Sequence, residues 1–233
     1  MNELHILLVT AISLGFIHTL LGPDHYLPFI VLSKARKWTQ SKTLWITFIS
    51  GIGHVGGSVI LGIAGVALGM SVSKLEAIEA HRGNIVAWML IAFGILYALY
   101  GIYKYFKHGG HAHLPHFLLP KKIRHLHHLP TTEAKSEEIT NITPWILFLI
   151  FVFGPCEVLI PLLIYPAAEH NYVGVALVSI LFGTATILTM LTIVLLGYKG
   201  TSLIKIKNQE RYMHLIAGII ILIAGLGMQF MGW

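Results

Sequence analysis

The apolar positions of this 233-residue chain fall into long runs that are separated by short polar stretches. A helix needs about 20 mostly apolar residues to cross a bilayer, and the pattern predicts about six such spans. The predicted spans cover residues 5–31, 43–70, 84–106, 143–166, 172–197 and 212–231. We therefore expect an all-α, polytopic membrane protein.

One long polar stretch, residues 107–142, interrupts this pattern between the third and fourth predicted spans. It contains Pro120, Pro130 and clustered histidines, a composition that is typical of a loop. The loop divides the chain into a first three-helix unit, residues 1–106, and a second three-helix unit, residues 143–233.

The composition supports a membrane location. Charged residues make up 11% of the chain, and the mean hydropathy is +0.75. Ordinary globular domains contain about 25% charged residues. The first apolar stretch is not preceded by a basic region, so we expect it to stay in the protein as a helix rather than to be removed as a signal peptide. A single cysteine, Cys156, excludes a disulfide framework within the chain.

Basic residues are concentrated in alternate connections, those that follow the first, third and fifth predicted spans. Of the 16 lysines and arginines, only Lys74 and Arg82 lie in the other connections. The positive-inside rule then predicts a multi-pass protein of the cell (inner) membrane, with both termini outside and the loop 107–142 in the cytoplasm. Because orientation accounts for the positive charge, we do not expect a nucleic-acid partner.

The sequence contains an internal repeat. A displacement of 132 residues aligns the Gly-Pro-Asp-His segment 22–25 with the Gly-Pro-Cys-Glu segment 154–157, and His54 with Thr186. Proline interrupts helices, so we expect broken first and fourth helices. Each half contains an odd number of spans, and the second half must therefore enter the membrane from the opposite side. This predicts a 3+3 inverted-topology repeat, in which transporters commonly place their sites near the midplane.

Several potential metal ligands lie at membrane depth, in the two repeated motifs and in the second span. Ionisable groups are costly there and by default indicate a binding site or a pathway. A set rich in imidazole suits nickel, cobalt, zinc or copper(II), whereas calcium and magnesium prefer oxygen ligands. The predicted ligands are His18, Asp24, His25, His54, Cys156 and Glu157. Two alternatives stay open, namely histidines that only link helices and an inert buried thiol.

Half of the chain's 14 histidines lie in the loop. Histidine-rich tracts commonly bind metals weakly and reversibly, and the alternative is a solvated polar linker. The predicted weak ligands are His108, His111, His113, His116, His125, His127 and His128.

The order His18, Asp24, His25 and then Pro28 resembles the nickel/cobalt permease (NicO) superfamily, and more closely its UreH-like (urease accessory) transmembrane branch. The larger nickel/cobalt transporters have a similar histidine one residue closer to the Asp-His pair. The second half is more distantly similar to the thiol-redox carriers of the CcdA and DsbD type. Those carriers need a cysteine in each half, whereas Asp24 occupies the first-half position here.

Together the residues and the resemblance predict a secondary transporter, rather than an enzyme, for a divalent transition-metal ion. Nickel or cobalt is the expected substrate, zinc and copper are alternatives, and no organic cofactor is expected. The expected partners are the lipid bilayer and the metal ion, while a cytosolic metallochaperone and a second copy of the chain stay open. Two other functions also stay open: a thiol- or electron-transfer membrane subunit that acts through Cys156, and a membrane scaffold that hands metal on for enzyme maturation.

Overall fold

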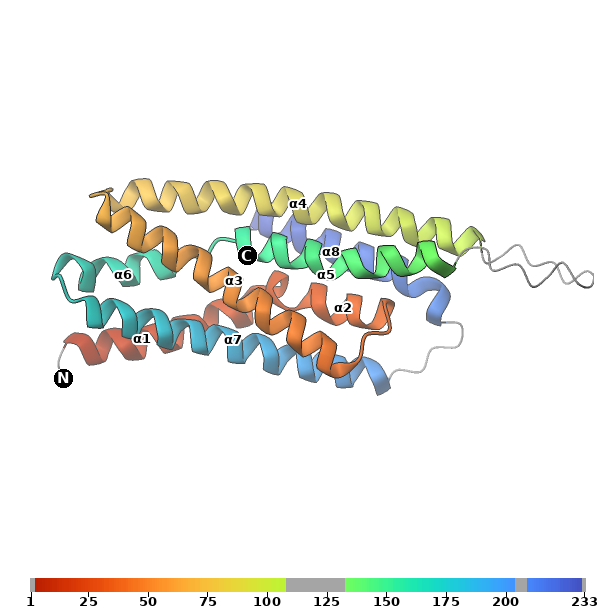
Figure 1. The fold of residues 1–233 in the computed structure, drawn as a ribbon, viewed down its shortest axis with the longest axis horizontal. Coiled ribbons are helices and arrows are strands. Elements are labelled where there is room, and N and C mark those ends of the chain that lie inside the picture. Colours follow the sequence, from red (N-terminus) through yellow and green to blue (C-terminus); the bar gives the residue numbers. More distant parts are fainter. Residues whose placement is uncertain (1–2, 108–132, 204–208, 232–233) are drawn as a thin grey trace, which may run out of the picture.

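The structure is a computed structural model that describes residues 3–107, 133–203 and 209–231 (Figure 1). Within these ranges the regular secondary structure is helical. The elements are α1 (Glu3–Leu21), the short 3-10 helix η1 (Pro23–His25), α2 (Leu27–Ala35), α3 (Gln40–Ala67), α4 (Val72–Lys107), α5 (Glu133–Phe153), α6 (Leu159–Ala168), α7 (Tyr172–Leu203) and α8 (Gln209–Met231).

The helices lie side by side in an elongated bundle (Figure 1). Helix α4 packs along α8, α1 packs along α7, and α3 contacts both α5 and α7. Helix α2 contacts α7 and α8 and is nearly enclosed, with Phe29 and Leu32 fully buried. The turns α3–α4 and α6–α7 lie at one end of the bundle, and the α2–α3 connection lies at the other (Figure 1).

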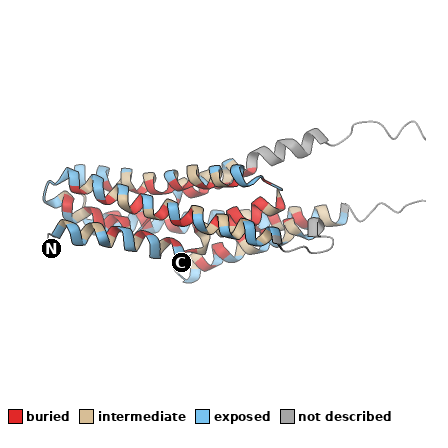
Figure 2. Ribbon diagram, turned by 90° about the horizontal axis from the view of Figure 1, so that it is seen from below, coloured by how far each residue is buried: buried red, intermediate tan, exposed pale blue. Residues whose placement is uncertain are grey.

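The outer surface of the bundle is apolar, as lipid contact requires. Exposed residues cover the outside and buried residues face the interior (Figure 2). Large apolar side chains such as Trp45, Ile60, Leu96 and Leu196 are more than half exposed. Soluble monomers rarely expose so much contiguous apolar surface. Five helices of the described ranges are long and apolar enough to cross a membrane, namely α1, α3, α4, α7 and α8. The chain is therefore a multi-pass membrane protein.

A Gly-Pro pair follows the last residue of α1 and of α5. Helix α1 ends at Leu21, just before Gly22, and α5 ends at Phe153, just before Gly154. The following prolines have no N–H to donate, and their rings clash with the preceding turn. The predicted fourth span, residues 143–166, is therefore divided between the end of α5 and the short helix α6, so five uninterrupted spans are found where we expected about six.

The helix boundaries follow the displacement of the sequence repeat. Helix α6 begins at Leu159, 132 residues after α2 begins at Leu27, and α7 begins at Tyr172, 132 residues after α3 begins at Gln40. These boundaries agree with two related halves. The opposite orientation of the halves in a bilayer stays a prediction.

Helix α4 corrects one predicted boundary. We expected this span to begin near residue 84, but the helix begins at Val72. The additional turns include Glu79 and Arg82, which form an ion pair three residues apart on the same helix, so charged residues are accommodated within α4 rather than in a connection. Helix α5 likewise begins early, at Glu133, within the predicted loop.

Glycines bring α4 and α8 into backbone contact. A Cβ atom added to Gly218 would lie 2.3 Å from the backbone nitrogen of Ala98, and one added to Gly101 would lie 2.4 Å from that of Leu215. Small residues permit this close approach of helices in membranes. Helices α4 and α8 are therefore in close contact at their backbones.

Replacement of Gly218 by alanine is expected to destabilise the bundle by about 1–3 kcal/mol, because the α4 backbone must move to admit the methyl group. Thermal unfolding in detergent measures the change. The matched control is Gly56→Ala, since a Cβ on Gly56 meets nothing within 4 Å. Equal stability of the two variants would contradict the close backbone contact between α4 and α8.

Candidate metal centre

The predicted ligands come from four separate elements that meet inside the bundle. His18 lies in the last turn of α1, and Asp24 and His25 form part of η1 in the first break. His54 lies in the middle of α3, and Cys156 lies in the second break, between α5 and α6. The two breaks and α3 therefore bring together side chains that are far apart in the sequence.

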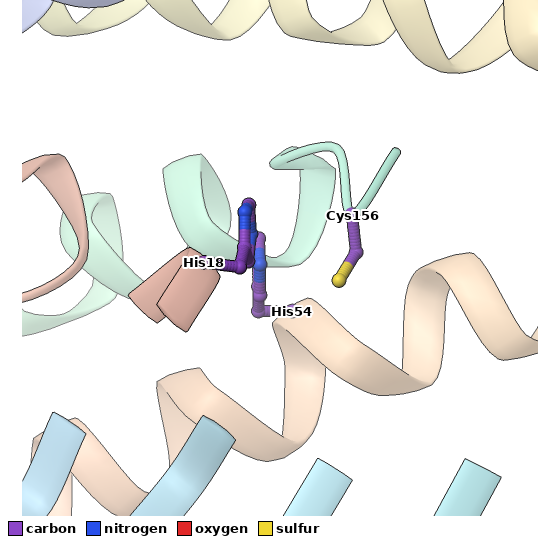
Figure 3. A group of neighbouring side chains, drawn as sticks. All are labelled: His18, His54 and Cys156. Atoms are coloured by element: carbon purple, nitrogen blue, oxygen red, sulfur yellow. The ribbon is translucent and has the colours of Figure 1, made fainter. Parts of the chain in front are cut away.

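Three of these side chains form a compact group of metal-ligating atoms. One ligand atom from each of His18, His54 and Cys156 lies within 4.8 Å of the other two. The side chains reach the group from three different elements, and the sulfur of Cys156 is turned toward the imidazoles (Figure 3). His54 is 3% exposed and Cys156 is 0% exposed, so the group is largely shielded from solvent.

His25 extends this group to a third imidazole. Its Nε2 atom lies 3.3 Å from Nε2 of His54, and its ring meets that of His18 edge to face at a centroid distance of 4.8 Å. Two nitrogen ligands of a tetrahedral zinc ion lie about 3.3 Å apart, given Zn–N distances of about 2.0–2.1 Å. The two nitrogens are within hydrogen-bond distance of each other, and the same spacing fits two ligands on one ion once the shared proton has left.

Backbone carbonyls at the two breaks orient the histidines. Nδ1 of His25 lies 3.2 Å from the carbonyl oxygen of Gly22 and 3.3 Å from Oδ2 of Asp24. The backbone of Phe151, at the end of α5, is a hydrogen-bond partner of His54. Metal-binding histidines almost always direct their second ring nitrogen to a carbonyl or carboxylate in this way, which fixes the nitrogen that faces the metal.

Two buried atoms of the group lack a partner among the described residues. They are Nε2 of His18 and Oδ1 of Asp24. A buried polar atom without a hydrogen bond costs free energy, so such atoms are rare and need an explanation. A cation that accepts electron pairs from nitrogen and oxygen would satisfy both atoms.

A small cavity adjoins the group beside His25 and His54. It measures about 20 Å³ and is lined by Asp24, His25, His54 and Gly154, together with apolar side chains from α4, α5 and α8, whereas His18 and Cys156 do not line it. A site needs roughly 10–15 Å³ to hold one water molecule. The cavity therefore has room for about one water molecule or one ion next to the two imidazoles.

The structure thus brings together His18, Asp24, His25, His54 and Cys156, but it places Glu157 apart from them. Glu157 is exposed, because successive side chains in the non-helical break point in different directions. The predicted weak ligands of the loop, at positions 108–128, lie outside the described residues.

Sequence analysis missed three residues that support the second break. Ser58 of α3 and Glu79 of α4 accept hydrogen bonds from the backbone N–H of Cys156, and Arg82 donates to the carbonyl oxygens of Val152 and Gly154. The available signal was the spacing of Glu79 and Arg82, which places opposite charges on one face of a helix.

A family comparison places the chain among known proteins. The model of the family described as "Cytochrome C biogenesis protein transmembrane region" matches residues 27–227 of the 233. The chain therefore belongs to this family of membrane proteins. No curated protein and no solved structure matches it. The match supports the distant likeness to the CcdA and DsbD carriers, whereas the closer likeness to the nickel/cobalt permeases and their UreH-like branch stays a prediction from the first motif.

Loss of a ligand from the group is expected to weaken binding of cobalt(II) to the detergent-solubilised protein. Groups that only hydrogen-bond to a metal ligand account for roughly 10–100-fold in metal affinity, so loss of a ligand in His54→Ala should cost at least this much. Cys156→Ser should in addition remove the sulfur-to-cobalt charge-transfer absorption. His81→Ala, an exposed histidine of α4, is the matched control. Unchanged affinity in His54→Ala would rule out this centre.

Proposed function

We propose that the protein transports a transition-metal ion, nickel or cobalt first, across the membrane through the centre of His18, His25, His54 and Cys156. One observation carries the proposal: ligand atoms from three elements lie within 4.8 Å of one another inside a membrane bundle. Imidazole and thiolate ligands suit these ions, with zinc and copper as the nearest competitors. The metal is the substrate in this proposal.

The broken helices support transport rather than static storage. Transporters commonly bind their substrate where discontinuous helices meet, near the midplane and between repeated halves. Here the first break supplies Asp24 and His25, and the second supplies Cys156. In the proposed cycle, rocking of the two three-helix halves opens the site to each side in turn, with the histidine-rich loop in the cytoplasm.

Family membership favours a second function, thiol or electron transfer, over metal transport. The family's description names cytochrome c biogenesis, and the likeness to CcdA and DsbD carriers implies chemistry at a pair of cysteines. In this chain Cys156 is the one cysteine, so a disulfide would need a sulfur from a partner. The side chain of Cys156 is 0% exposed, which blocks a partner's thiol in this conformation. The local geometry therefore favours the metal, although the family favours thiol transfer.

Flux measurements in proteoliposomes separate the two functions. We expect uptake of nickel or cobalt by the intact protein, and a loss of at least tenfold in His25→Ala, since a binding-site ligand contributes more than the 10–100-fold typical of its outer-shell partners. His81→Ala should leave the flux unchanged.

The thiol function predicts the opposite order of effects. Wild-type vesicles would then show no flux of nickel, cobalt, zinc or copper. A partner cysteine would form a mixed disulfide with Cys156, and Cys156→Ser would abolish it while His18→Ala and His54→Ala had mild effects. This result would replace metal transport by the second function.

A further inference from the structure

The two breaks are stabilised in different ways. The first is closed largely by its own residues, because the backbone N–H of Tyr26 donates to the carbonyl of Pro23 and the N–H of His25 donates to that of Gly22. The second break also has local backbone bonds, from the N–H of Gly154 to the carbonyl of Phe151 and from the N–H of Leu159 to that of Cys156, but it is held in addition by side chains from other helices. The backbone N–H of Cys156 donates to Oε2 of Glu79, at 3.0 Å, and to Oγ of Ser58, at 3.1 Å.

Glu79 and Arg82 satisfy the groups that the second break leaves without helical partners. Glu79 is fully buried and accepts a hydrogen bond from the backbone N–H of Cys156. Nη2 of Arg82 lies 3.3 Å from each of the carbonyl oxygens of Val152 and Gly154. Nη1 of Arg82 also donates to Oε1 of Glu79. One ion pair therefore provides both the acceptor and the donor that the interrupted backbone needs.

Glycines make room for this arrangement. A Cβ on Gly57 of α3 would lie 2.8 Å from the carbonyl oxygen of Val152 and 3.0 Å from Nη2 of Arg82. A Cβ on Gly83 of α4 would lie 3.0 Å from Cγ of Pro155. The break is thus in close contact with both α3 and α4, and its backbone has little freedom to shift while the ion pair is intact.

We propose that Glu79 and Arg82 are positioning residues that hold the Cys156 thiol in the metal centre and so determine its preference for thiophilic cations. The proposal rests on the proposed function in so far as the centre binds metal. Glu79 acts on the backbone of the one sulfur ligand, whereas His18 and His54 are carried by α1 and α3. Loss of the ion pair therefore displaces the sulfur ligand first, while His18 and His25 remain, because α1 and the first break carry them.

Titrations with cadmium(II), a soft cation, and with nickel(II), a borderline one, distinguish loss of the sulfur ligand from loss of the whole centre. Thiolate ligands select soft ions, and imidazole suits nickel without sulfur. In Glu79→Ala the affinity for cadmium(II) should fall by roughly 10–100-fold, the usual cost of losing an outer-shell partner. The affinity for nickel(II) should fall by a smaller factor, because the histidines remain. Alkylation of Cys156 by N-ethylmaleimide, measured without metal, should become faster.

The experiment compares full-length variants in detergent by cadmium and nickel titration and by the alkylation rate. Arg82→Ala should behave like Glu79→Ala, and the conservative Arg82→Lys and Glu79→Asp should restore part of the cadmium preference. Glu76→Ala, an exposed carboxylate one turn away on α4, is the matched control. Glu79→Gln keeps the shape of the side chain but loses the ion pair with Arg82, so it provides a folded variant if Glu79→Ala does not fold, and we expect the same changes in it to a smaller extent.

The outcomes separate this proposal from metal transport itself. Equal loss of cadmium and nickel affinity, or an unchanged alkylation rate in Glu79→Ala and Glu79→Gln, overturns the positioning role even if the wild type transports metal. A wild type that binds neither ion refutes the proposed function. Faster alkylation in the variants would then still support the positioning of Cys156 by the ion pair.

Discussion

Backbone groups at membrane depth must find hydrogen-bond partners within the protein, because the bilayer core offers none. This constraint governs the structure wherever the chain departs from a helix, at Gly22 and at Gly154. Each break leaves amides and carbonyls without helical partners, and the protein satisfies them with local backbone bonds and, at the second break, with polar side chains from α3 and α4. His25 lies against the carbonyl oxygen of Gly22 in the first break, and His54 meets the backbone of Phe151 in the last turn of α5. The same requirement explains why α4 carries the buried Glu79–Arg82 pair beside the second break.

The family shown by the comparison and the chemistry of the centre point in different directions. The fold belongs to the cytochrome c biogenesis transmembrane family, whereas the residues at the breaks are histidines, a carboxylate and a single thiol. A fold determines where a site can form, but the side chains at the site decide its chemistry. In this chain the first break carries Asp24 beside His25, and the second carries Cys156. This combination provides ligands for a cation, whereas a disulfide relay within the chain needs two sulfurs.

The sequence predicted the features that depend on local pattern. Hydropathy identified the membrane helices, the Gly-Pro pairs located both breaks, and the ionisable residues at membrane depth identified five of the side chains that meet. It did not locate the start of α4, because charged residues such as Glu79 and Arg82 indicate a solvated connection, although in the fold they pair with each other and contact α3 and the second break. It grouped Glu157 with Cys156 because they are neighbours in the chain. The non-helical break instead buries Cys156 and exposes Glu157, a difference that only the backbone conformation reveals.

In the proposed centre, one cation is bound jointly by imidazole nitrogen and the Cys156 sulfur. X-ray absorption spectroscopy at the metal edge of the zinc-, cobalt- or nickel-loaded protein identifies these ligands. For zinc, we predict a shell of nitrogen ligands at about 2.0–2.1 Å together with one sulfur at about 2.3 Å. The sulfur contribution should be absent in Cys156→Ser. A shell of oxygen and nitrogen alone in the wild-type protein would show that Cys156 lies outside the centre and would refute joint binding.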